Sequence, residues 1–197
     1  GIAQGRIGYR FPITCDGLRG NIAYTGMGYK IVEGEAVSLQ PDGQSHGIDA
    51  GLSYPLLRSR AANINTVAGY QFKTLSDRSA GETISNKSLH SGSFGLSGDR
   101  FDTLLGGGYG SWNISITAGS LHQEVSAASL PNTDGTFLHV NTGLSRLQRL
   151  ADRLTIALSW NAQHSLDNLD SSEKFYLGGP YGVRAYPVGE ASGDEGH

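Results

Sequence analysis

The chain has 197 residues, of which 38% are hydrophobic and 17% charged, and its formal net charge is −3. This slight acidic excess excludes the strongly basic surface that a nucleic-acid partner requires. The single cysteine, Cys15, excludes an intrachain disulfide, and the absence of any run of about 18 apolar residues excludes a membrane-spanning helix. A mean hydropathy of −0.28 is compatible with a soluble β protein or with a membrane β-barrel, because barrel strands alternate lipid-facing and lumen-facing residues.

Apolar and polar residues alternate with a period of two in eight segments, a pattern typical of strands with one apolar and one polar face. The alternation is cleanest in the sixth segment, where Trp112, Ile114 and Ile116 are separated by Asn113 and Ser115. In the second segment, two alternating sets compete for the apolar face: Ile22 and Tyr24 against Met27, Tyr29 and Ile31. The expected strands lie at residues 7–13, 21–32, 48–56, 63–73, 87–98, 111–118, 138–145 and 154–163.

The connections between the expected strands alternate in length. Three are short and each carries arginine, at residues 55–61, 98–104 and 147–153. Three others are longer and polar, at residues 33–45, 76–86 and 121–135. Outer-membrane barrels have short periplasmic turns at one end and longer extracellular loops at the other, so this alternation favours such a barrel.

The polar face of the expected strands consists mainly of Ser, Thr, Asn, Gln and Gly. The charged share of 17% is below the roughly 25% typical of soluble domains. Aromatic residues near the strand ends fit the girdles found at membrane interfaces; those expected on the apolar face are Tyr54, Tyr70, Phe72, Trp112, Phe137 and Trp160. A membrane barrel is therefore favoured, and a soluble β-sandwich, whose strands also alternate, is the alternative.

Residues 165–197 follow the eighth expected strand and form a long segment rich in glycine. Counting connections from the short turn at 147–153 places this segment on the extracellular side, and loops of this length are usually functional. Its Arg184 can hold the loop inside a polar lumen through a bidentate pair with a carboxylate. Acidic residues of the same segment are either solvated or acceptors for that arginine: Asp170, Glu173, Glu190, Asp194 and Glu195.

Three short motifs stand in this segment. Residues 175–179 read Phe-Tyr-Leu-Gly-Gly, residues 183–186 read Val-Arg-Ala-Tyr, and residues 189–194 read Gly-Glu-Ala-Ser-Gly-Asp. With them the chain resembles the C-terminal barrel of two-partner secretion transporters, the haemolysin secretion/activation proteins of the ShlB/FhaC/HecB family, in the same superfamily as the BamA assembly factor. Residues 53–59, Ser-Tyr-Pro-Leu-Leu-Arg-Ser, support the resemblance at a short turn. The tetrapeptide usually has glycine where this chain has Ala185.

The resemblance implies an all-β fold, a partial antiparallel transmembrane β-barrel of about eight strands from the interior of a sixteen-stranded barrel. Residues 1–164 would supply the strands and residues 165–197 the lumen-directed loop, so that 1–197 is a single domain. POTRA domains are absent from this sequence, which is expected to be a piece of a longer protein. The acidic partner of the arginine would lie on a strand beyond the loop. The residues that would form and support the loop are Val183, Arg184, Ala185, Tyr186, Leu177, Gly178, Gly179, Gly182, Glu190 and Asp194.

The function that the resemblance implies is secretion and activation of a large partner exoprotein, of the hemolysin or adhesin type, across the bacterial outer membrane. The expected partners are this exoprotein and membrane lipid, with no nucleic acid, no enzymatic reaction, no metal and no cofactor. Neither an HExxH zinc motif nor a Gly-x-Ser-x-Gly elbow is present. An assembly factor of the BamA type is the first alternative, and a soluble β-sandwich binding module is the second.

Overall fold

The computed structural model describes residues 1–30, 41–126, 134–177 and 192–196, without the side chains of residues 125 and 126. Within these ranges the chain is built almost entirely of strands, as the alternation predicts. The long strands are β1 (Ile2–Pro12), β2 (Arg19–Lys30), β3 (Asp42–Arg58), β4 (Ala62–Ser79), β5 (Glu82–Asp102), β6 (Gly108–Ser126), β7 (Gly135–Ala151) and β8 (Leu154–Ser165). Two short strands follow, β9 (Phe175–Tyr176) and β10 (Ser192–Gly193). No helix in the described part of the chain has the length and apolar character needed to cross a bilayer.

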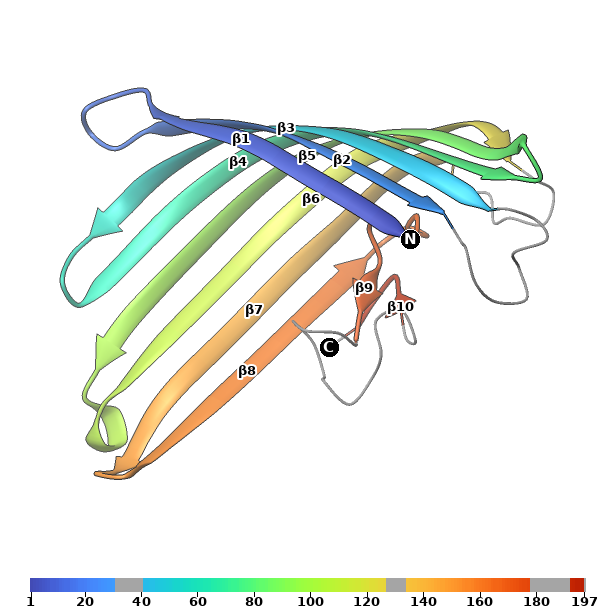
Figure 1. Ribbon diagram of the computed structural model, residues 1–197. Coiled ribbons are helices and arrows are strands. Elements are labelled where there is room, and N and C mark those ends of the chain that lie inside the picture. Colours follow the sequence, from blue (N-terminus) through green and yellow to red (C-terminus); the bar gives the residue numbers. More distant parts are fainter. Residues whose placement is uncertain (31–40, 127–133, 178–191, 197) are drawn as a thin grey trace. The chain divides into compact units, whose positions relative to one another are not determined.

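The long strands form one open antiparallel sheet in which each strand pairs with its neighbours in the sequence, in the order β1 to β8 (Figure 1). The expected short turns are confirmed, since residues 59–61 join β3 to β4 and residues 152–153 join β7 to β8. Residues 103–107, which include the 3₁₀ turn η2 (Leu104–Gly106), join β5 to β6. Residues 33–40 and 127–133 of the expected loops at 33–45 and 121–135 lie outside the described residues. The expected loop bounds are too wide, because residues 42–45 belong to β3, residues 121–126 to β6 and Gly135 to β7.

The chain divides into two compact units by its internal contacts. The first comprises Gly1–Leu52, Gly69–Gly92 and Ala118–Thr136, and the second comprises Ser53–Ala68, Ser93–Thr117 and Phe137–His197. The second unit contains the three turns between β3 and β8 together with the C-terminal segment. The sites described below belong to this second unit.

The prediction of a long loop at residues 76–86 is wrong, because this stretch forms a tight hairpin. Strand β4 runs to Ser79 and β5 begins at Glu82, so only residues 80–81 form the turn. Ala80 and Gly81 have φ values of 53° and 82°, and positive φ at both central residues is the geometry that matches the twist of paired strands. Polar residues on both faces of this stretch hide the alternation; Asp77, for example, accepts a 2.8 Å hydrogen bond from the hydroxyl of Tyr29.

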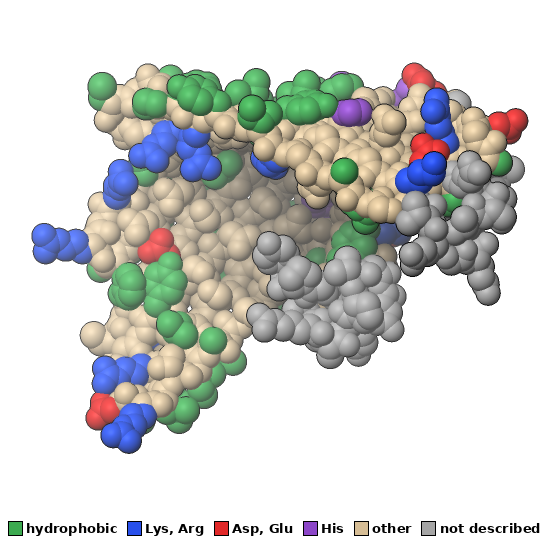
Figure 2. Space-filling view, in the orientation of Figure 1, with side chains coloured by type: hydrophobic (Ala, Val, Ile, Leu, Met, Phe, Trp, Pro, Cys, Tyr) green, Lys and Arg blue, Asp and Glu red, His purple; other side chains and the backbone are tan. Residues whose placement is uncertain are grey.

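The register of the first hairpin resolves the ambiguous phase of the second expected strand. Ile22 pairs with Tyr9 and Tyr24 pairs with Ile7, and directly paired residues lie on the same face. Ile22 and Tyr24 therefore belong to the apolar face. Large residues of this face are exposed throughout the sheet, and those on β6 to β8 are Trp112, Ile114, Ile116, Leu144, Leu154, Ile156, Leu158 and Trp160. Figure 2 shows hydrophobic side chains along the β7–β8 hairpin and charged ones at its tip.

The polar face carries hydrogen bonds between neighbouring and next-neighbouring strands. Gln71 Nε2 donates to Asp49 Oδ1 at 2.7 Å in the first unit. Asn63 Nδ2 donates to Asp99 Oδ2 at 3.0 Å in the second. Pairing neutral amides with carboxylates in this way satisfies the hydrogen-bonding groups of these polar side chains.

Phe137 does not lie on the apolar face, so its assignment to an aromatic girdle is wrong. Its ring stacks on that of His139 with a centroid separation of 6.0 Å and an interplanar angle of 7°. Residues two apart in a strand point to the same side of the sheet, and both side chains are buried. Phe137 lies near the start of β7 on the polar side of the sheet, where its ring packs against His139.

A polar network holds the turn between β5 and β6 against β7. The buried side chain of Gln148 donates through Nε2 to the carbonyl oxygens of Leu104 at 2.9 Å, Leu105 at 3.2 Å and Gly107 at 3.1 Å. Its Oε1 accepts from Arg146 Nε at 3.0 Å. The two N–H groups of this amide are shared among the carbonyl groups of the turn, of which those of Leu104 and Gly107 also accept backbone N–H groups, from Gly107 and Arg149.

Candidate functional site: the base of the C-terminal loop

The two flanks of the expected loop motif come together as a small hairpin. Tyr176 pairs with Ser192 and Phe175 pairs with Gly193, which makes β9 and β10 antiparallel (Figure 1). This pairing closes the intervening segment at its base. Most of the expected motif and support residues lie outside the described residues: Gly178, Gly179, Gly182, Val183, Arg184, Ala185, Tyr186 and Glu190. Leu177 and Asp194 are described.

Gln163 of β8 fastens both flanks to the sheet. Its side chain is buried, and its Nε2 donates to the carbonyl oxygens of Glu173 at 3.0 Å and of Asp194 at 3.2 Å. Its backbone exchanges two hydrogen bonds with Gly196, at N···O distances of 2.8 and 3.0 Å. Because the peptide groups on both sides of the loop bind the same residue, the loop begins and ends at a fixed point on β8.

The carboxylate of Asp194 joins three parts of this base. Its Oδ1 accepts the backbone N–H of Leu169 at 2.9 Å and lies 3.2 Å from Nζ of Lys174. Leu169 is only 1% exposed, so its N–H group has little access to water. A charged acceptor for a buried donor is among the stronger hydrogen bonds of a protein, which makes Asp194 the central residue of the base.

Other acidic residues of the segment are also engaged by the protein. Glu195 Oε1 lies 2.7 Å from Nδ1 of His164, and Glu173 Oε2 lies 3.7 Å from Nε2 of the buried His139. The side chain of Glu173 is 13% exposed and that of Glu195 56%, so Glu173 lies largely within the protein, whereas Glu195 remains accessible to solvent. In the described ranges no group of three or more His, Cys, Asp or Glu side chains is arranged to hold a metal ion.

The roles of Gln163 and Glu173 in this base are not evident from the sequence. Gln163 belongs to the polar face of the eighth expected strand, where alternation predicts only its side and not its partner. The sequence offers one signal: Gln163 lies two residues before the end of β8, so its long side chain is near the segment that follows, but this position does not identify its partner. The arrangement supplies hydrogen bonds and ion pairs that position the two described flanks of the loop.

An antiparallel sheet in sequence order, with short turns, one exposed apolar face and a polar face that holds a loop, is the architecture of an outer-membrane β-barrel protein. A sequence model of the family described as "Haemolysin secretion/activation protein ShlB/FhaC/HecB" matches residues 7–197. The chain belongs to this family, and the resemblance seen in the sequence motifs is confirmed.

Curated and solved relatives agree with this assignment. The chain is 28% identical to the heme/hemopexin transporter protein HuxB of Haemophilus influenzae over 202 residues, covering 100% of this chain and 35% of HuxB. It is similar in fold to CdiB from Escherichia coli, with a TM-score of 0.81, 22% identity, and coverage of 98% of this chain and 36% of that one. CdiB from Acinetobacter baumannii gives a TM-score of 0.71 at 17% identity. The chain thus spans about a third of the length of the relatives it matches, and its fold is that of part of their barrel.

Proposed function

We propose that the whole protein is an outer-membrane transporter that secretes and activates a large partner exoprotein, of the hemolysin or adhesin type, by two-partner secretion. Residues 1–164 would form strands from the interior of its barrel, and residues 165–197 a loop directed into the lumen. The family match over residues 7–197 is the observation that supports this most directly. The name of HuxB describes a heme/hemopexin transporter, which is consistent with transport but leaves the cargo of this protein to experiment.

The polar face provides a suitable surface for an extended chain in transit. Neutral side chains such as Asn113, Ser115 and Asn161 offer hydrogen bonds without fixed charge, so they would not hold any one segment of the cargo. The loop anchored at Gln163 and Asp194 would narrow or gate this path. In this proposal Arg184 fixes the loop tip by pairing with a carboxylate on another strand.

Replacing Arg184 with alanine in the full-length protein is expected to lower secretion of the exoprotein by about tenfold or more, since a lost charge-assisted pair is equivalent to about 1.5–3 kcal/mol. The measurement is the amount of exoprotein in the medium when both proteins are expressed together, at equal barrel levels in the outer membrane.

The matched control is Arg78→Ala, which removes an exposed arginine from the end of β4 and should leave secretion unchanged. Normal secretion by the Arg184 variant would contradict the role of the loop. If the wild-type protein itself exports nothing, the secretion function is wrong, and insertion of other barrels becomes the activity to assay.

A further inference from the structure

An open groove of about 420 Å³ lies among β5, β6, β7 and β8, on the side of the sheet that carries the apolar residues. The register pairs Leu144 with Trp160 and Arg146 with Leu158, so these four side chains share a face. Trp112 of β6 also lines the groove. Two indoles and two leucines make the groove apolar along most of its length, which suits a hydrocarbon chain.

One end of the groove is charged. Arg146 donates two hydrogen bonds to the carboxylate of Asp102. The bond from Nη2 to Oδ1 is 2.8 Å long. This pair is therefore neutral as a unit. Arg100 also lines the groove, and as it lies two residues before Asp102 on β5 it is on the same face.

The guanidinium of Arg100 is the uncompensated charge of this end. Its side chain is exposed, and the one electrostatic interaction that it makes in the described part of the chain is a Coulombic attraction to Asp102, whose carboxylate is already paired with Arg146. Two arginines and one aspartate leave a net charge of one positive unit beside an apolar groove. This combination is complementary to a molecule with an anionic head and a hydrocarbon tail.

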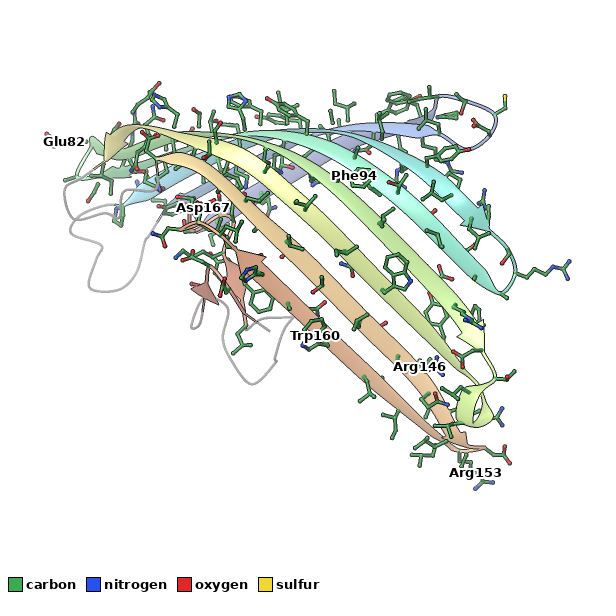
Figure 3. All side chains as sticks on the ribbon, turned by 180° about the vertical axis from the view of Figure 1, so that it is seen from behind. Glu82, Phe94, Arg146, Arg153, Trp160 and Asp167 are labelled. Carbon is green, nitrogen blue, oxygen red and sulfur yellow. The ribbon has the colours of Figure 1, made fainter. Side chains whose placement is uncertain are left out.

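The charged end also lies near the turns. Asp102 is the last residue of β5, and only Thr103 separates it from η2. Figure 3 shows Arg146 between Trp160, farther along the hairpin, and Arg153 at its tip. Short turns of an outer-membrane barrel lie at the periplasmic surface, and tryptophan is enriched at membrane interfaces because one part of its ring system is apolar and the other polar. The groove thus runs from headgroup level toward the acyl region.

We propose that this groove binds one anionic glycerophospholipid of the periplasmic leaflet. Arg100 would contact the phosphate through its planar fork of N–H donors, and Trp112 and Trp160 would pack against the glycerol and the first part of an acyl chain. The proposal rests on the location of the barrel in the outer membrane and does not depend on secretion.

The test uses the purified full-length protein in detergent with phosphatidylglycerol as the probe, and counts retained lipid by native mass spectrometry. Arg100→Gln is expected to lower retention of the most tightly held phosphatidylglycerol by about tenfold, the loss of roughly one charge-assisted contact. Arg100→Lys, which keeps the charge, should retain part of the binding. Arg58→Gln is the matched control, because Arg58 is an exposed arginine at the end of β3 and does not line the groove.

Equal retention by the Arg100→Gln variant and the wild type would overturn the proposal, and so would an equal loss in the Arg58→Gln variant, which would indicate non-specific attraction to basic turns. A second measurement uses the wild-type protein alone, so that its result does not depend on whether the variants fold. Wild-type protein should retain phosphatidylglycerol in preference to zwitterionic phosphatidylethanolamine, and equal retention of the two lipids would also refute an anion site.

Discussion

Replacement of Asp194 with alanine in the full-length protein is expected to lower secretion by about tenfold or more while the barrel still reaches the outer membrane. The substitution removes the acceptor for the Leu169 N–H group and the ion-pair partner of Lys174. Losing a charged hydrogen bond to a buried donor destabilises by about 1.5–3 kcal/mol, which is one to two orders of magnitude in the population of an anchored loop. Secretion and limited proteolysis of isolated outer membranes measure the two consequences separately, with new cleavage expected between residues 166 and 177.

Two further variants make the Asp194 experiment specific. Asp194→Asn keeps an oxygen that accepts from Leu169 and loses the pair with Lys174, so an intermediate effect is expected. Asp152→Ala removes an aspartate at the β7–β8 turn whose side chain is 94% exposed, and should change neither readout. Cleavage that stays at the wild-type level in the Asp194→Ala variant would show that the carboxylate does not hold the base of the loop, whatever happens to secretion.

The strands were predictable because each has one apolar and one polar face, and the hydrophobic effect places apolar side chains on only one of them. A strand between two different environments must alternate, and the sixth and eighth expected strands do so clearly. The prediction failed at residues 76–86. Both faces of the strands are polar there, and Asp77, for example, accepts a hydrogen bond from Tyr29, so apolar and polar residues do not alternate. The prediction also failed at Phe137, because an aromatic residue at a strand end can belong to either side and only its stacking on His139 decides.

The site was harder to predict than the fold for a different physical reason. Motif residues such as Arg184 can be proposed from a sequence resemblance alone. The residues that hold the loop, Gln163 and Asp194, act through contacts between segments that are separated in the chain. A side chain's partner across such a distance depends on register and on where the chain turns back, and neither is encoded in the local pattern.

Replacement of Gly98 with valine is expected to destabilise the barrel by about 2 kcal/mol, within the range for overpacked sites. A Cβ atom at Gly98 would lie 2.7 Å from Nε1 and from Cε2 of Trp112. The indole lies directly over this glycine and is a rigid ring, so it has to move as a whole. The measurement is the temperature at which the folded form of the full-length protein is lost in a gel-shift assay after heating in detergent.

Gly92→Val provides the control for this substitution. Gly92 lies on the same strand and the same face, six positions away, and a Cβ there meets no atom within 4 Å. The same change in backbone freedom therefore occurs without the collision. If both variants unfold at the same temperature, the close approach of Trp112 is not what requires glycine at position 98. A larger loss in the Gly98 variant would also predict weaker lipid retention, because Trp112 lines the groove.

The order of the sheet has a consequence for how the protein reaches its folded state. Every strand from β1 to β8 pairs with the strand that precedes or follows it in the chain, so no strand of this sheet needs a partner from beyond the neighbouring hairpin. The entropy lost in closing each hairpin is then small, and topologies dominated by pairings between such neighbours fold faster than those that need distant pairings. The sheet can therefore form one hairpin at a time, because each new strand forms hydrogen bonds with the preceding strand, which is already part of the sheet.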